Sequence, residues 1–413
     1  MMFIRSRIVC LALFMTSIVW SHGQTLALHD GDRVVFYGDS ITAQRLYTRF
    51  VEDFLLTRYP QMHVSFRNAG VPGDTVNGGY TGDMAARLKR DLIPYQPTVV
   101  TIMLGMNDGY YMPFNQKYLD IYEEGYRRLL HEIESKLPSA RITLISPTPY
   151  DEVTHGTEFA HYNEVVGRHA AFVKELATAS HFGFSDFYQT ETNLVKAAMQ
   201  RNQTLAGLLV PDRIHPAEAS HWIMAADLAR IWGLSPVVSS VHLDALQAKV
   251  ITAENTLITG LTVQGDNLQW TQADSALPLP LPLENGEVQF ALGISDLAAM
   301  DQQILRVDGL TAKRYKLEID GHAIASFNRE EFTAGINLAL YATPMESQAK
   351  NVDGTELKRT RLDEAHFILA IEDPKVAGDA GASTVLEAKD GALAEEQRKA
   401  AQPLPHRFEL LPE

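Results

Sequence analysis

The chain has 413 residues, of which 46% are hydrophobic and 21% are charged, which is a composition typical of globular proteins. This length exceeds what one hydrophobic core usually organises, so we expect two folded units. The formal net charge is −15, and such a chain repels phosphate groups. Nucleic acid and anionic membrane surfaces are therefore excluded as expected partners.

The first 23 residues have the pattern of a signal peptide. A basic start with Arg5 and Arg7 precedes an apolar run at 8–20, and small residues follow it. A membrane-spanning helix needs about 20 apolar residues, so a cleaved signal peptide is favoured over an anchor. We expect a secreted or periplasmic mature protein without stable membrane insertion. The single cysteine, Cys10, lies in the removed segment, so we expect no disulfide and no thiolate site.

The region from residue 24 to 235 predicts a catalytic domain of the α/β class. Short β-branched runs alternate with longer helical patterns, which is typical of βαβ units and a parallel sheet. The expected fold is a three-layer α/β/α sandwich. We expect strands at 33–37, 63–67, 98–104, 141–146 and 184–187, and helices at 44–58, 84–92, 117–136, 162–180 and 216–232.

The pattern changes after residue 235 to short strand-like runs with turn dipeptides. Asn285-Gly286 and Asp320-Gly321 predict tight turns, the second within a hairpin. The LPLPLPL run at 277–283 predicts an extended edge or connector, because proline donates no ladder hydrogen bond. Helical patterns follow, and residues 375–401 are either a loose helix or partly disordered. We expect a β-containing accessory module at 236–345 and a helical tail at 346–413.

Ser40 is the candidate nucleophile. It stands in Gly38-Asp39-Ser40, directly after the first predicted strand. The tripeptide alone favours a helix N-cap serine. Its position changes the interpretation, because open α/β sheets bind ligands where a strand ends and a helix begins. The helix N-terminus there offers N–H groups to a developing anion.

Two further polar turns follow the next two strands. NAGVPGDT at 68–75 contains Gly73, and Gly105-Met-Asn-Asp contains Asn107. Parallel topology brings these turns to the same edge of the sheet as Ser40. A serine nucleophile needs donors aimed at the oxygen that becomes charged. The backbone N–H groups of Ser40 and Gly73 and the Asn107 amide are candidates, since glycine lets backbone approach the substrate.

An Asp-x-x-His pattern supplies the candidate base. Asp212 and His215 stand shortly before the last predicted helix, and this spacing lets the carboxylate reach the imidazole. Asp212 would then hold one ring nitrogen while the other takes the Ser40 proton. A second copy, Asp363 and His366, lies in the helical C-terminal region and predicts an ordinary pair on a helix surface.

Taken in order over residues 34–220, these four blocks resemble the SGNH (GDSL-type) hydrolase family. The resemblance implies a flavodoxin-like sandwich, ester hydrolysis by double displacement, and no metal or cofactor. It also implies that Ser40 is nucleophile and oxyanion donor, Gly73 and Asn107 are the other donors, His215 is the base and Asp212 orients it. It assigns no role to residues 236–413. Gly-x-Ser-x-Gly is absent, which argues against the α/β-hydrolase fold.

The expected substrate is a small ester or an acylated carbohydrate that loses an acetyl or other short acyl group. Predicted export and a β-containing module that could bind glycan motivate this expectation. A lipase, lysophospholipase or thioesterase is the alternative, and it would need a long apolar groove. A catalytically silent glycan-binding protein would have lost a catalytic residue, and none is missing. The oligomeric state stays open.

Other candidate groups have simpler interpretations. His155, His161 and His169 have near-helical spacing and could be imagined as metal ligands, but a solvated helix face is favoured because no carboxylate completes a set. Aromatic residues near the predicted site could stack on a sugar or pack in the core. They are Tyr110, Tyr111, Tyr150 and Trp222.

Overall fold

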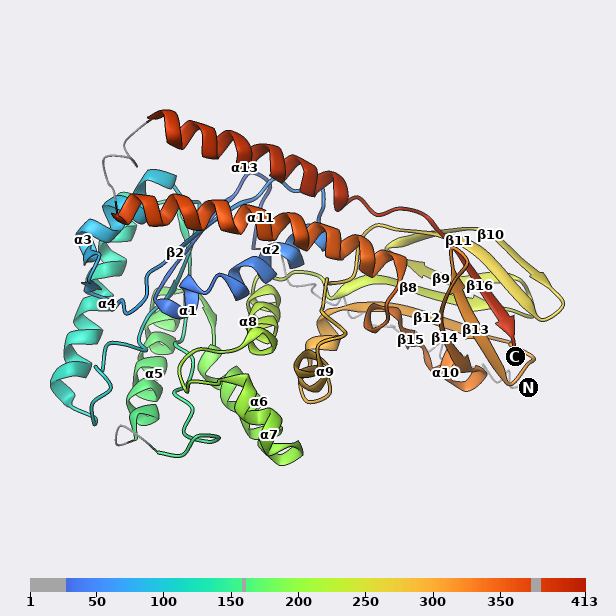
Figure 1. The fold of residues 1–413 in the computed structure, drawn as a ribbon, viewed down its shortest axis with the longest axis horizontal. Helices are drawn as coiled ribbons and strands as arrows, with labels where there is room; N and C mark the ends of the chain where they lie inside the picture. The colour runs from blue at the N-terminus through green and yellow to red at the C-terminus, as the bar shows by residue number, and fades with distance from the viewer. Residues whose placement is uncertain (1–26, 158–160, 373–379) are drawn as a thin grey trace, which may run out of the picture.

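The computed structural model describes residues 27–157, 161–372 and 380–413 (Figure 1). The predicted signal peptide at 1–23 lies outside these residues. A five-stranded parallel sheet with the order β2-β1-β5-β6-β7 forms the centre of the first part. Its strands are β1 (Arg33–Gly38), β2 (Ser65–Gly70), β5 (Val99–Met103), β6 (Arg141–Ile145) and β7 (Gly183–Ser185).

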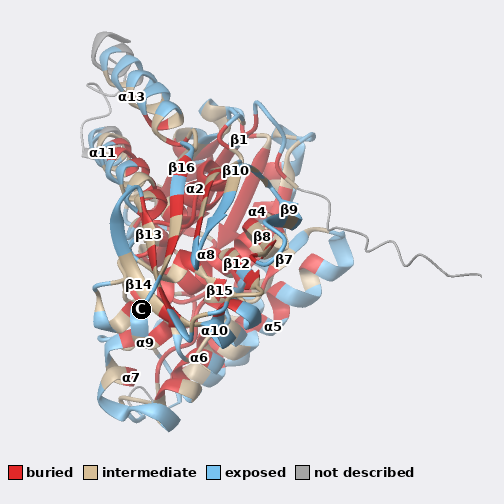
Figure 2. Ribbon diagram, turned by 90° about the vertical axis from the view of Figure 1, so that its right-hand side faces the viewer, coloured by how far each residue is buried: buried red, intermediate tan, exposed pale blue. Residues whose placement is uncertain are grey.

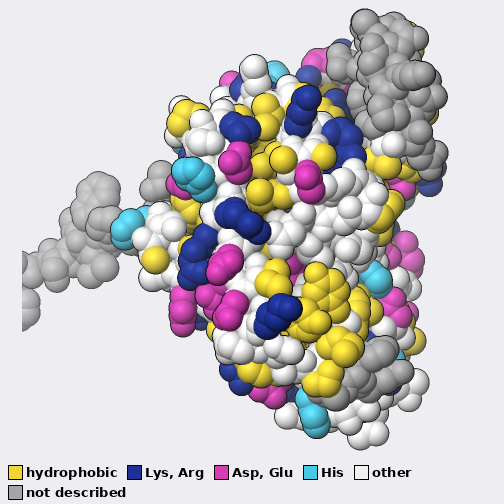
Figure 3. Space-filling view, turned by 90° about the vertical axis from the view of Figure 1, so that its left-hand side faces the viewer, with side chains coloured by type: hydrophobic (Ala, Val, Ile, Leu, Met, Phe, Trp, Pro, Cys, Tyr) yellow, Lys and Arg dark blue, Asp and Glu magenta, His cyan; other side chains and the backbone are white. Residues whose placement is uncertain are grey.

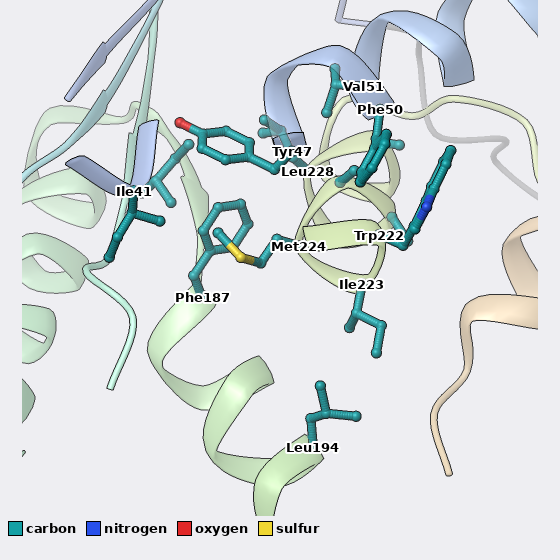
Figure 4. Close-up of a cluster of buried hydrophobic side chains, with 14 of the residues drawn as sticks. Ile41, Tyr47, Phe50, Val51, Phe187, Leu194, Trp222, Ile223, Met224 and Leu228 are labelled. Carbon is teal, nitrogen blue, oxygen red and sulfur yellow. The ribbon is translucent and has the colours of Figure 1, made fainter. Parts of the chain in front are cut away.

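Helices cover both faces of this sheet, so the predicted three-layer α/β/α class is confirmed (Figure 1). One face packs against α2 and α8, and the other against α4 and α5. Figure 4 shows part of the first core, where Trp222 of α8 stacks on Phe50 of α2 at 3.8 Å between ring centroids. The helices are α1 (Ser40–Ala43), α2 (Leu46–Arg58), α3 (Met84–Arg87), α4 (Gln116–Lys136), α5 (Tyr162–Ser180), α6 (Phe187–Arg201), α7 (Gln203–Leu209) and α8 (Glu218–Ile231).

Several predicted boundaries in this part are wrong, and the strand expected at 63–67 lies at 65–70. The helix expected at 44–58 begins only at Leu46, because Arg45 has a left-handed backbone with φ of 62° and separates α2 from the short α1. The strand expected to end at Phe187 stops at Ser185, since the Asp186 side chain accepts from the Gln189 N–H and starts α6. The helix expected at 84–92 ends at Arg87 and continues as a wider π-helical turn.

One antiparallel sheet and one mixed sheet form the second part, around a second hydrophobic core. One has the order β10-β11-β16-β13-β14, and the other β15-β12-β8-β9. Their strands are β8 (Val237–Asp244), β9 (Lys249–Glu254), β10 (Thr256–Gln264), β11 (Asn267–Asp274), β12 (Gln302–Asp308), β13 (Arg314–Ile319), β14 (His322–Asn328), β15 (Ile336–Asn337) and β16 (His406–Pro412). Short helices α9 (Gly286–Leu292) and α10 (Arg329–Ala334) interrupt them.

The turn predictions in the second part have different outcomes. The hairpin at Asp320-Gly321 is confirmed, with positive φ at both residues between β13 and β14. The turn at Asn285-Gly286 is wrong, because the Asn285 side chain accepts from the Glu287 N–H and caps α9. The LPLPLPL run forms no strand and is a buried connector. Leu277 packs in the second core, whereas Leu279 packs in the first.

The C-terminal residues form two long helices and a strand. α11 (Pro344–Glu372) and α13 (Ala380–Ala400) lie side by side along the first part, in orange and red in Figure 1. Figure 2 shows buried residues concentrated in the sheets and exposed ones along α13. Residues 406–412 form β16 between β11 and β13, so the tail is not helical throughout. The division at 235 and 345 stays a prediction.

Candidate active site

The turn after β1 places Ser40 at the first position of α1. Asp39 is the N-cap of this helix, since its side chain accepts a hydrogen bond from the Ile41 N–H at 3.0 Å. The capping role considered for Ser40 therefore belongs to Asp39. The Ser40 N–H has no acceptor within the helix, because the first N–H groups of a helix have none.

The structure brings Ser40, His215 and Asp212 together. The Ser40 Oγ lies 2.8 Å from His215 Nε2, and His215 Nδ1 lies 2.7 Å from Asp212 Oδ2. The other Asp212 oxygen accepts from the backbone N–H groups of Ile214 and His215 at 3.0 and 2.7 Å. Partial burial raises the pKa of Asp212, but hydrogen bonds from His215 outweigh burial and hold it below its ordinary value. Asp212 therefore stays charged beside the imidazole.

Asn107 and Gly73 lie at the same cleft as Ser40. The Asn107 amide nitrogen donates to the Asp74 carbonyl at 2.9 Å, and its oxygen accepts from the Tyr111 hydroxyl at 3.0 Å. These two bonds fix the orientation of the amide, and its nitrogen carries a second hydrogen. Gly73 has φ of 73°, and a Cβ there would meet no atom within 4 Å. Backbone conformation, rather than crowding, is what favours glycine.

The cleft itself has a volume of about 760 Å³ and is open to solvent. Small and apolar side chains form most of its wall, and among its described lining residues there is no Lys or Arg. The lining residues are Ser40, Ala43, Gln44, Leu46, Pro72, Gly73, Asn107, Tyr111, Pro211, Asp212, His215, Pro216 and Ala217. The cleft can thus hold a neutral, partly apolar group against Ser40.

Three buried carboxyl groups support the site loops, and none of them was predicted from the sequence. Burial raises the pKa of Asp39 to about 7 and that of Asp108 to about 8. Burial also raises the pKa of Asp74 to about 6, although Arg87 opposes the increase. Asp108 accepts from the Val76 N–H at 3.0 Å, which ties two site loops together. Their positions in the sequence could have identified these acids, because each one is adjacent to a predicted site residue.

Most of the remaining sequence candidates lie away from the cleft. His169 is buried and its Nδ1 lies 2.8 Å from the Gly105 carbonyl, so the expected solvated position is wrong. Burial lowers the pKa of His169 to about 4. Tyr150 and Trp222 pack in the core, whereas Tyr111 lines the cleft and Tyr110 is 56% exposed. In the described part of the chain, no group of three or more metal-ligating side chains comes together.

Asp363 of the second Asp-x-x-His pattern is not an ordinary surface residue. It lies on α11, and its carboxylate pairs with Arg45 and Arg67 of the first part.

Across the three described ranges, no helix combines the length and apolarity needed to span a membrane.

Comparison with known proteins places the first part of the chain. Residues 36–223 match the model of the GDSL-like Lipase/Acylhydrolase family. An acetylxylan esterase of Geobacillus stearothermophilus is 28% identical over 235 residues, which cover 52% of this chain and 100% of that protein. The solved structure of a gut microbial diltiazem-metabolizing enzyme has a TM-score of 0.80 at 23% identity. The matched region covers 94% of this chain and 98% of that enzyme's chain, so the similarity in fold extends through both parts. Residues 36–223 belong to the GDSL-like lipase/acylhydrolase (SGNH) family, which marks the chain as a carboxylic ester hydrolase.

Proposed function

We propose that Ser40, His215 and Asp212 carry out ester hydrolysis by double displacement. The observation that carries this proposal is the continuous hydrogen-bond path from Ser40 Oγ through the imidazole to Asp212, with links of 2.8 and 2.7 Å. In the first step the Ser40 oxygen bonds to the ester carbonyl carbon, and its proton moves to His215 Nε2. The carbonyl oxygen becomes negative and accepts from the donors of Ser40, Gly73 and Asn107.

The second half of the reaction returns the enzyme to its starting state. When the tetrahedral intermediate collapses, the bond to the alcohol oxygen breaks and His215 gives that oxygen its proton. The acyl group is then bound to Ser40. Water attacks the acyl carbon as His215 takes a proton from it, and collapse releases the carboxylic acid and returns the proton to Ser40. The charged Asp212 stabilises the imidazolium that forms in both steps.

We propose that the substrate is a carbohydrate ester carrying an acetyl or other short acyl group. The similarity to an acetylxylan esterase over its whole length supports this. The cleft also lacks Lys and Arg among its described lining residues, whereas a phosphate-bearing lysophospholipid or thioester favours a cation there. Predicted export of the chain would bring it to extracellular polysaccharide.

Exposed aromatic surface beside the cleft further supports a sugar substrate. Tyr110, Met112 and Phe114 are exposed and belong to the loop that leads from the site into α4. Figure 3 shows hydrophobic side chains gathered on the face formed by α3, α4 and α5. The adjoining Tyr110 and Tyr111 both have left-handed backbones, a strained arrangement typical of binding sites. Such rings can stack on the apolar faces of sugars.

An acyl-chain series tests both proposals. Turnover is measured on p-nitrophenyl acetate, butyrate and octanoate and on acetylated xylo-oligosaccharides, with wild type, Ser40→Ala and the exposed-site control Ser180→Ala. We expect Ser40→Ala to lose activity on all substrates and Ser180→Ala to keep it. Full activity of Ser40→Ala would overturn the nucleophile assignment. A preference for octanoate over acetate would instead support the lipase alternative.

A further inference from the structure

The carboxylate of Asp363 reaches from α11 to the junction between α1 and α2 and to strand β2. One oxygen pairs closely with the Arg45 guanidinium, and the other lies 2.7 Å from Arg67 Nη1. The backbone N–H of Asn68 donates to the same carboxylate at 3.4 Å. The Arg45 and Asp363 side chains are only 8% and 17% exposed. This contact joins residues that are 318 positions apart in the sequence.

The partners of Asp363 are also the residues that hold α1. Arg45 joins α1 to α2 in a left-handed conformation, and its N–H donates to the Thr42 carbonyl at 2.9 Å. The Asn68 side chain donates to that same carbonyl at 2.7 Å. A Cβ on Gly70 would lie 2.3 Å from the Ala43 nitrogen, so the end of β2 already touches the end of α1. Thr42 is two positions from Ser40, which leaves the helix little freedom to shift.

Charge explains why this contact needs the carboxylate. Asp363 lies between two guanidinium groups, and removing its charge would leave those like charges together in a partly buried place. Burial raises the pKa of Asp363, but Arg45 and Arg67 outweigh burial and hold it below its ordinary value. The carboxylate is therefore ionised at neutral pH. Without it, Arg45 would reorient, and the α1–α2 junction would move with its backbone.

We propose that Asp363 is a positioning residue for the ester hydrolase: from α11 it fixes Arg45 and Asn68, and through them the place of Ser40 relative to His215. This inference rests on the assignment of Ser40 as the nucleophile. It makes α11 part of the catalytic unit, although α11 lies outside the predicted catalytic domain. The competing explanation is that the ion pair only attaches α11 to the first part of the chain.

A matched pair of variants on α11 separates the two explanations. Asp353 also forms an ion pair from α11, with Arg49 of α2 at 3.5 Å, but Arg49 is not part of the α1–α2 junction. Asp363→Asn and Asp353→Asn remove the same charge from the same helix in the full chain. The readouts are kcat and KM on p-nitrophenyl acetate, and Tm.

We expect Asp363→Asn to lower kcat at least about tenfold with KM changed less than about threefold, because small misplacements of reacting groups cost about this much or more. Asp353→Asn should keep kcat within about twofold. Asp363→Glu, which restores a carboxylate, should recover part of kcat. Equal effects of the Asp363 and Asp353 asparagine variants on kcat would overturn the proposal.

A second link in the same path covers the case in which Asp363→Asn does not fold. Arg45→Lys keeps the charge but loses the planar group that pairs with the carboxylate, and we expect it to lower kcat with little change in Tm. Wild-type kcat in Arg45→Lys would contradict the path through Arg45. If Ser40→Ala is inactive while Asp363→Asn has wild-type kcat, only this inference fails. If Ser40→Ala is active, the proposed function fails first.

Discussion

Acid should destabilise this protein through His221, a histidine buried in α8 beneath the cleft. Its Nδ1 accepts a hydrogen bond from the Tyr47 N–H at 3.2 Å, and its Nε2 lies 3.1 Å from the Gln44 side-chain oxygen. Both bonds suit a neutral ring with its proton on Nε2. Burial is the main cause that lowers the pKa of His221 to about 3, from an ordinary value of 6.5.

The size of the effect follows from that difference in pKa. Below pH 6.5 the unfolded chain takes up a proton at His221 and the folded chain does not, so stability falls with pH until the folded group also titrates near pH 3. Between pH 7 and pH 5 the loss from this group is about 2 kcal/mol. His221→Gln keeps a donor and an acceptor but cannot titrate. Its free energy of unfolding should therefore fall about 2 kcal/mol less than that of wild type over this interval.

Urea unfolding followed by circular dichroism at pH 7 and pH 5 gives the two free energies for each protein. His131→Gln is the control, because His131 is exposed on α4 and its replacement should leave the wild-type pH difference in place. The comparison uses the change with pH, so a general loss of stability in His221→Gln does not affect it. An identical pH dependence in His221→Gln and wild type would refute the reasoning.

Three other outcomes follow from the structure. Asn107→Ala should lower kcat about 10²- to 10³-fold with little change in KM, since Asn107 lines the cleft and we propose its amide as an oxyanion donor. Gly73→Ala and Gly156→Ala should each lose roughly 1–2 kcal/mol of stability, because both glycines have φ near +70° in open space. Only Gly73→Ala should lower kcat. A chain ending at residue 235 should be insoluble, because it lacks residues of the first core such as Leu279. If this shortened chain were soluble and active, the catalytic domain would fold independently of the rest.

The predicted site residues could be identified from sequence because chain order fixes their place in a parallel sheet. Ser40, Gly73 and Asn107 follow β1, β2 and β5, and these three strands are neighbours in the order β2-β1-β5. Both pairings, β1 with β2 and β1 with β5, are parallel, so the carboxyl ends of the three strands meet at one edge. Local motifs plus this single topological rule were sufficient to predict that Gly73 and Asn107 lie at the same cleft as Ser40.

Some local sequence patterns are compatible with two different structures, and the sequence alone could not decide between them. Asn285-Gly286 suits both a tight turn and a helix start, because asparagine favours each for the same hydrogen-bonding reason. His169 lies in a helix, but its helical spacing did not show that it faces the Gly105 carbonyl instead of water. For His169 the deciding contact is made by Gly105, a residue that the local sequence does not contain.

The connection between the two parts of the chain was hidden for the same reason. In LPLPLPL, Leu277 belongs to the second core, together with Leu56 of α2, whereas Leu279 and Leu281 belong to the first. The Arg58 side chain, buried at the end of α2, bonds the Leu277 carbonyl and the Asp301 carboxylate, so polar groups at this boundary have partners from both parts. A buried cation whose partner is removed is strongly destabilising. A composition change at residue 235 therefore marks where the secondary structure changes, whereas stability depends on an interface that continues well beyond that residue.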